Sequence, residues 1–280
     1  MSESALHSYL EKWLAAQPAQ RLALPFVEDP AFAGHLALAA LEQEWIEAAY
    51  GIREPQVAQV KLNWWAEELA GAPAGGGRHP LTQALFAAPQ AGQVELADWL
   101  APIRAAMAQL DAPTPADFAE QRVRAEAFHG AIAQLETRWW FGADADPSRA
   151  GVHAVVDHLL HVTARLDQYR EHERLPLPMA RLARHGLDRS ALASDSPARR
   201  NAVREQLRDI AGLLRPVRDS RAPLSLFRGL QMRENGRLLR RARRAGDPLA
   251  RLQSGRAKPA PASVFRAWSA AREWRRRADD

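Results

Sequence analysis

Apolar residues recur at intervals of three and four positions along most of the chain, and short Pro- or Gly-containing segments separate these periodic stretches. This period is typical of amphipathic helices, whereas the alternation that marks strands is scarce. Asp29-Pro30 has the form of a helix start and Gly51 that of a helix stop. The pattern predicts helices over residues 3–16, 29–50, 55–70, 78–88, 94–110, 115–140, 150–172, 179–185, 197–214, 222–245 and 262–276.

The stretches between these helices are predicted as loops, the longest of them over residues 246–263. Neither an internal repeat nor a clear linker interrupts the succession of helices. A single all-α domain over residues 1–280 is therefore the simplest architecture. The composition agrees, because 47% hydrophobic residues suffice for a core and Ala, Leu, Arg and Glu favour helix.

The chain contains no cysteine, which excludes disulfides, zinc-thiolate sites and a cysteine nucleophile. It also lacks a Gly-x-Ser-x-Gly elbow and a Gly-rich phosphate loop after a strand. Its net charge is +5, and much of the excess lies late, at residues 237–244 and 275–277. Such runs favour a solvated helix face, with attraction to anionic lipid headgroups as the alternative. No reader motif accompanies the charge, so we expect no nucleic-acid partner.

The N-terminal segment is amphipathic and carries early acidic residues, unlike a signal or transit peptide. No apolar run approaches the ~20 residues that span a bilayer. We therefore expect a cytoplasmic protein, with peripheral contact at the inner face of a membrane as a further expectation.

The most distinctive string is REPQVAQVKLNWWAEEL, at residues 53–69. Helical spacing puts Lys61, Trp64 and Glu68 on one face together with two valines. The pair Trp64-Trp65 is unusual in such a polar helix. The two indoles either fill the core, as large aromatic side chains mostly do, or line a cavity.

A second string, at residues 158–187, contains His158, His161, Glu171 and His172. Their spacing matches no established zinc motif, so the sequence favours ordinary core or solvated histidines over a metal site. The string ends in LPLPMARLARHGL, where each Pro disfavours helix in the residue before it.

These two strings, with His79-Pro80, AGDPLARL at 245–252 and SVFRAWSAAREW at 263–274, resemble the squalene/phytoene synthase family. The resemblance implies an all-α isoprenoid synthase-type helical bundle around a central cavity. It also implies two facing aspartate-rich motifs that hold Mg²⁺ and bind prenyl diphosphates. Hard cations take carboxylate oxygens, and the metal stabilises the departing diphosphate.

This chain departs from both motifs. Counted back from Leu175-Pro176, the second motif falls on Leu159, Thr163 and Asp167, which would share one cavity-facing side of a helix. The first motif falls in LEQEWIEAAY (41–50), which offers Glu44 and Glu47 but no aspartate. Mg²⁺ prefers one or two carboxylates together with phosphate, so the stripe through Asp167 is a poor metal site.

A lone Glu44 ahead of Arg-Glu-Pro and Trp-Trp resembles a divergent branch of the family. That branch includes the mitochondrial assembly factor for respiratory complex I, which is not thought to be a working synthase. The favoured hypothesis is a catalytically impaired, cofactor-free member that keeps a cavity for a prenyl diphosphate or other lipid-like ligand, or that assembles a protein partner.

The alternative is an active prenyltransferase that uses an altered magnesium set, and an unrelated helical protein is the third possibility. The candidate metal ligands are Glu44, Glu47, Asp167 and Glu171. The candidate cavity residues are Glu44, Glu47, Lys61, Trp64, Trp65, Glu68, Leu159, Thr163 and Asp167. The candidate diphosphate ligands are Arg53, Lys61 and Arg170.

Overall fold

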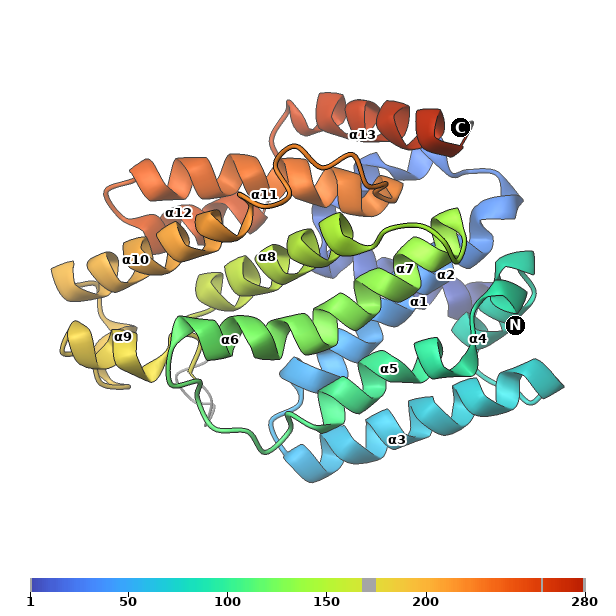
Figure 1. The fold of residues 1–280 in the computed structure, drawn as a ribbon, viewed down its shortest axis with the longest axis horizontal. Helices are drawn as coiled ribbons and strands as arrows, with labels where there is room; N and C mark the ends of the chain where they lie inside the picture. The colour runs from blue at the N-terminus through green and yellow to red at the C-terminus, as the bar shows by residue number, and fades with distance from the viewer. Residues whose placement is uncertain (1, 168–174, 258, 279–280) are drawn as a thin grey trace.

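The computed structural model describes residues 2–167, 175–257 and 259–278, and these residues form helices and no strand (Figure 1). The first part of the chain forms α1 (Ser2–Ala16), α2 (Ala33–Ile46), α3 (Pro55–Gly71), α4 (Pro80–Phe86), α5 (Leu96–Met107), α6 (Phe118–Ala125) and α7 (Ala131–Phe141). The second part forms α8 (Ser148–Ala164), α9 (Met179–Arg184), α10 (Pro197–Leu213), α11 (Leu226–Arg244), α12 (Pro248–Ala257) and α13 (Ser263–Ala278). The predicted all-α class is confirmed.

Two of the predicted helices contain π-helical turns. The helix expected over 29–50 begins as a short 3₁₀ turn capped by Asp29, continues as α2, and ends in a π turn over Glu47–Gly51. The helix expected over 115–140 is divided by a second π turn, Glu126–Gly130, into α6 and α7. Such π turns insert a residue into the helical register and re-aim the side chains beyond them.

The prediction of a loop over 246–263 is wrong, because α12 occupies most of it. The Asp247 side chain accepts a hydrogen bond from the backbone N–H of Ala250 at 3.1 Å and so starts the helix. Leu249 and Leu252 are buried. A Cβ on Gly255 would lie 2.4 Å from Leu238 of α11, so this glycine permits close packing of the two helices. Tertiary packing therefore overrides the local Pro and Gly signals.

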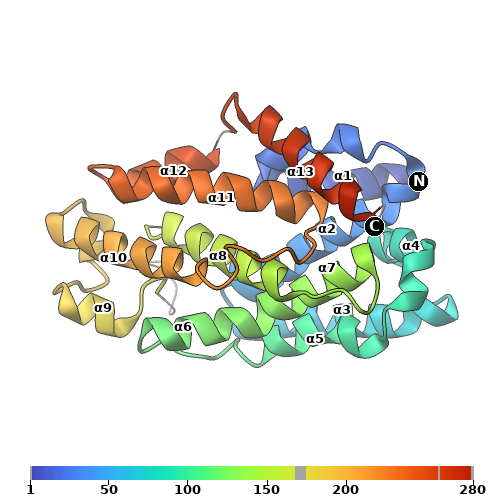
Figure 2. The same ribbon diagram turned by 45° about the horizontal axis from the view of Figure 1, so that its top comes forward.

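The hydrophobic interior has two main clusters. The first contains the indoles of Trp45, Trp65, Trp99 and Trp139, and it joins α1–α5 and α7 to the beginning of α11 and to α13. The second joins α8, α9, α10 and α12 to the remainder of α11. Helix α11 thus contributes to both clusters, and Figure 2 shows it between α13 and α8. The single-domain expectation for residues 1–280 stays a prediction.

Within the described ranges, none of the helices combines the length and apolar character needed to cross a bilayer.

Candidate functional site

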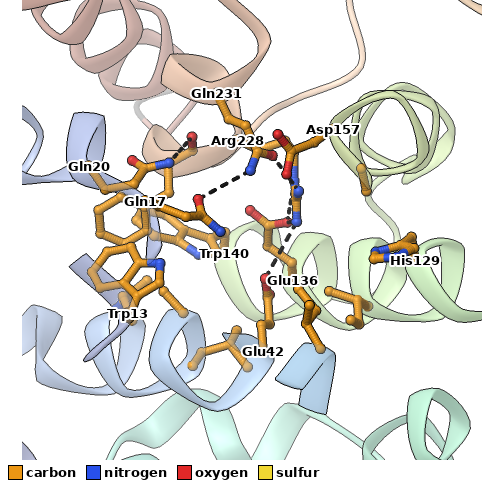
Figure 3. A pocket seen from close by; sticks show the side chains of 17 residues that line it. Trp13, Gln17, Gln20, Glu42, His129, Glu136, Trp140, Asp157, Arg228 and Gln231 are labelled. Carbon is orange, nitrogen blue, oxygen red and sulfur yellow. Dashed lines mark hydrogen bonds and ion pairs between the residues drawn. The ribbon is translucent and has the colours of Figure 1, made fainter. Parts of the chain in front are cut away.

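A buried ion pair joins α7 to α11. Nε and Nη2 of Arg228 donate to Oε2 of Glu136 at 2.8 and 2.5 Å. Nη2 also lies 3.5 Å from Oε2 of Glu42 on α2. Figure 3 shows the three side chains converging from three different helices.

The cap of α11 fixes the position of Arg228. Ser225 is the N-cap residue, and its hydroxyl accepts a hydrogen bond from the backbone N–H of Arg228 at 3.0 Å. The same hydroxyl donates to the second carboxylate oxygen of Glu136. One serine therefore satisfies an amide of the first helical turn and extends the ion-pair network.

Glu42 is the acid of this cluster whose charged form is disfavoured. Burial disfavours its charged form and the neighbouring Glu136 repels it, so the pKa of Glu42 is held well above its ordinary value even though Arg228 opposes the shift. The positive charge of Arg228 is then balanced by Glu136.

A partly buried acid, Asp157, comes from α8. Asn235 and Arg256 donate to its Oδ1 at 2.9 and 3.2 Å. Burial raises the pKa of Asp157, but Arg256 and Asn235 outweigh burial, and the net pKa is lowered. Burial and the adjacent Arg256 lower the pKa of His161 to about 3. Asp157 is therefore an ionised, paired carboxylate beside a neutral histidine.

These acids line a small cavity of about 40 Å³ whose wall is part polar and part apolar. Gln17, Gln20 and Gln231 add amides to its wall, and Trp13 and Trp140 form its apolar side (Figure 3). This volume accommodates about one or two water molecules. The cavity is too small for a prenyl chain.

A much larger cavity, of about 1400 Å³, lies beyond a wall of three aromatic rings. Tyr50 and His158 line it, and both rings contact His129, which lines the small cavity. The ring centroids of His129 and His158 are 4.2 Å apart. Burial, followed by the neighbouring His158, lowers the pKa of His129 well below its ordinary value, so the His129 side of the wall is uncharged.

The lining of the larger cavity is amphipathic. Its apolar residues include Ala49, Ile52, Leu110, Val162, Leu175, Leu182 and Leu187. Its cationic residues are Arg53, Arg124 and Arg189, and its acidic residues are Glu54, Asp111 and Asp188. Arg53, predicted as a diphosphate ligand, is therefore placed at a cavity that also offers a long apolar wall.

Glu44 and Lys61 contact each other, but as an internal ion pair and not as an open ligand site. The Lys12 ammonium lies 2.5 Å from one oxygen of the buried Glu44 carboxylate, and the Lys61 ammonium lies 3.0 Å from the other. Burial raises the pKa of Glu44, but the two lysines outweigh burial and lower it. Glu44 is consequently a carboxylate that two internal cations already neutralise.

Glu47 folds back over its own π turn. A Cβ on Gly51 would lie 2.4 Å from Oε1 of Glu47, so the carboxylate occupies the space that this glycine leaves open. Glu44 and Glu47 are thus engaged differently, one with lysines and the other over a backbone turn.

The tryptophan pair is divided between core and surface. Trp65 is 1% exposed, whereas Trp64 is 42% exposed and packs edge-on against Trp65 and His79. Glu68 is buried and accepts hydrogen bonds from the backbone N–H groups of Arg78 and His79 at 2.6 and 2.7 Å. Glu68 therefore holds the chain that enters α4, which is a structural task.

The expected stripe of Leu159, Thr163 and Asp167 does not form one cavity-facing side, because α8 ends at Ala164. Leu159 and Thr163 are completely buried, and the Thr163 hydroxyl donates to the backbone carbonyl of Leu159 at 2.6 Å. Asp167 is exposed and accepts from Gln253 of α12 at 3.1 Å. Arg170 and Glu171 lie outside the described residues.

The sequence profile of the squalene/phytoene synthase family matches residues 22–262. The chain belongs to this family. Among proteins of curated function, none matches the sequence. Among the solved structures that share the fold, two are similar over nearly the whole of both chains.

The first of these structures is a dehydrosqualene synthase in complex with ligand, at 10% identity and a TM-score of 0.68, which covers 99% of this chain and 98% of its own. The second is squalene synthase HpnC from Alicyclobacillus acidocaldarius, at 14% identity and a TM-score of 0.57, which covers 96% and 95%. At these identities the likeness shows the isoprenoid synthase fold.

The described acids of this squalene/phytoene synthase family member do not fit a magnesium centre. No group of three or more histidine, aspartate or glutamate side chains in the described ranges is arranged to hold a metal ion. Lysines occupy both oxygens of Glu44, and Arg256 and Asn235 engage Asp157. A magnesium ion would have to displace these partners before it could coordinate the carboxylates.

Sequence reasoning missed Glu42, Glu136, Asp157 and Arg228. One of them carried a usable signal, because Arg228 is the single charge in the otherwise largely apolar string LSLFRGL. A charge amid apolar neighbours suggests a buried ion pair. Asp157 carried none, because its role depends on which side of α8 faces the cavity.

Proposed function

We propose that this protein binds a lipid-like isoprenoid ligand in its larger cavity and does not perform magnesium-dependent coupling of prenyl diphosphates. The observation that carries the proposal is the occupation of its buried acids by the protein's own cations. Glu44 is held by Lys12 and Lys61, and Glu136 is held by Arg228. Buried carboxylates with such partners are costly to release to another cation.

The dimensions and lining of the larger cavity support the ligand class. Its volume of about 1400 Å³ exceeds the ~300–1,000 Å³ typical of sites for drug-sized molecules. Its apolar wall suits a hydrocarbon chain, and Arg53 and Arg189 suit an anionic head, since guanidinium groups bind phosphate oxygens in a bidentate manner. A prenyl diphosphate combines both features.

Binding is tested with farnesyl diphosphate and farnesol by calorimetry, with either EDTA or Mg²⁺ present. We expect both ligands to bind in EDTA, and Arg53→Gln to weaken farnesyl diphosphate more than farnesol. Val162→Phe places an aromatic ring in the cavity wall at α8 and should weaken both. Val152→Phe is the matched control, because Val152 lies on the same helix but packs in the second core cluster. Binding that requires Mg²⁺ would contradict the metal-free site.

Catalysis is tested separately, by diphosphate release from farnesyl or geranylgeranyl diphosphate with Mg²⁺. The proposal expects no turnover. Turnover that Asp167→Ala abolishes would instead establish the altered-ligand prenyltransferase, with Asp167 as a metal ligand. If the wild type neither bound farnesyl diphosphate or farnesol nor turned over a prenyl diphosphate, the proposed ligand would be rejected. The proposed lack of magnesium-dependent coupling would still hold.

A role in assembling a protein complex is the second candidate, in line with the resemblance to the complex I branch. The observation that favours it is an exposed apolar stripe on α3, formed by Val57, Val60 and Trp64. A deletion strain should lose NADH:quinone activity, and the wild type but not Val57→Asp/Val60→Asp should restore it. If the wild type and the double variant both restored the activity, the exposed stripe on α3 would not be needed for it.

A further inference from the structure

Helix α13 has apolar residues on two sides. One side is covered, because Ala267, Ala270, Ala271 and Trp274 are buried in the first core cluster. The Trp274 ring packs edge-on against Phe32 and Trp140, with centroids 5.4 Å away in both cases. This side anchors α13 firmly to the rest of the protein.

The other side presents large apolar groups to the exterior. Val264 is 55% exposed, Phe265 74% and Trp268 53%. Helical spacing puts the three on one face, in the first turns of α13. Isolated exposed apolar residues are common, but adjacent exposed aromatic residues usually mark an interaction surface.

Arginines continue the same face toward the end of the helix. Arg272, Arg275 and Arg276 are exposed and share the angular sector of the apolar residues. The Arg272 guanidinium lies 5.5 Å from the centre of the Trp268 ring, a cation–π distance. The outward face of α13 is therefore apolar in its first turns and cationic in its later turns.

Among the residues that the structure describes in α13, the one acid, Glu273, does not neutralise this charge. Glu273 points to the inner flank, where its carboxylate binds Arg149 at 2.9 Å and Arg233 at 2.6 Å. Those two arginines already balance it. The outward charge of the described part of α13 is therefore positive, which complements an anionic surface.

We infer that the outward face of α13, formed by Val264, Phe265, Trp268, Arg272, Arg275 and Arg276, docks on an anionic lipid bilayer. Amphipathic helices that lie in the membrane interface place Trp, Phe and aliphatic side chains among the acyl chains and Lys or Arg beside the headgroups. Figure 1 shows α13 at the outer edge of the molecule, with α11 on its inner side, so a flat surface can reach it. This inference is independent of the proposed ligand.

The test is cosedimentation of the full chain with vesicles of phosphatidylcholine alone or mixed with phosphatidylglycerol. We expect binding to the mixed vesicles that falls as salt is raised. Phe265→Ser/Trp268→Ser should abolish it. Arg272→Gln/Arg275→Gln/Arg276→Gln should weaken it by at least about tenfold, since each basic residue near such a surface contributes several-fold.

Arg240→Gln/Arg241→Gln/Arg243→Gln is the matched control. It removes the same charge from exposed positions of α11 and should leave binding within about twofold of the wild type. Equal loss in both triple variants would overturn the assignment, because binding would then depend on net charge alone. Absence of wild-type binding at low salt would also overturn it.

Two further outcomes would assign the outward face of α13 to a different partner and would reject its binding to a lipid bilayer. One is self-association in sedimentation velocity that Phe265→Ser/Trp268→Ser removes. The other is binding of single-stranded DNA by the same arginines with no binding to mixed vesicles. Because every substituted side chain is exposed, circular dichroism should show all variants folded.

Discussion

The Arg228 guanidinium donates two hydrogen bonds to a single oxygen of Glu136, at 2.8 Å from Nε and 2.5 Å from Nη2, inside the protein. The resemblance to synthases predicts metal-bound acids in the interior, whereas this chain pairs a buried acid with its own arginine. The cation is covalently part of the fold, so neutralisation of Glu136 requires no cofactor.

This pair should behave as a single energetic unit. Arg228→Leu and Glu136→Leu each leave one buried charge unpaired and should lower the free energy of unfolding by roughly 3–5 kcal/mol. The double variant should cost much less than the sum, because both charges are then gone. Urea unfolding of the four proteins measures the coupling, and strictly additive losses would contradict a direct interaction.

The two adjacent tryptophans should differ sharply. Trp65→Ala opens a cavity in the core and should cost roughly 3–5 kcal/mol. Trp64→Ala removes a ring that is 42% exposed and should cost below about 1.5 kcal/mol. Chemical denaturation of both variants makes the comparison, and equal losses would mean that Trp64 is buried in solution.

Acid should destabilise the protein through His35. This histidine is buried against Trp139 and Trp140, and burial lowers its pKa from 6.5 to about 4. The unfolded chain therefore takes up this proton first as the pH falls. Stability from the neutral ring is complete above about pH 6.5 and is lost progressively down to about pH 4.

The loss reaches up to roughly 3 kcal/mol, at about 1.4 kcal/mol per pKa unit. Unfolding free energies of wild type and His35→Leu, measured across this window, test the assignment. The difference between the two proteins should shrink toward pH 4. A constant difference would show that His35 keeps an ordinary pKa in the folded protein.

Gly34 should tolerate no side chain. A Cβ there would lie 2.7 Å from Ala88 and 2.8 Å from the buried ring of Trp139. Gly34→Ala should therefore lower stability by about 1–3 kcal/mol through overpacking.

Gly151→Ala is the control for this substitution. Gly151 also lies near the beginning of a helix, but a Cβ there meets nothing within 4 Å. It should be neutral or stabilising by about 0.5–1 kcal/mol, because Ala is the better helix former. Thermal unfolding distinguishes the two, and equal effects would show that α2 shifts to make room.

The sequence alone determined the helices, because the 3.6-residue period and the Pro and Gly signals are local properties. It also indicated the family, because the motifs around Trp64-Trp65 and LPLP are short uninterrupted strings that can be recognised without a structure. It failed at α12, where packing of Leu249 and Leu252 outweighs local Gly and Pro signals.

Only the tertiary structure decided which acids face which cations. The partners are far apart in the chain, as Glu136 is 92 positions from Arg228 and Glu44 is 32 from Lys12. Two π turns and the early end of α8 also changed which side chains face the cavities. Charge pairing depends on distances of a few ångströms between helices, and helical periodicity does not contain those distances.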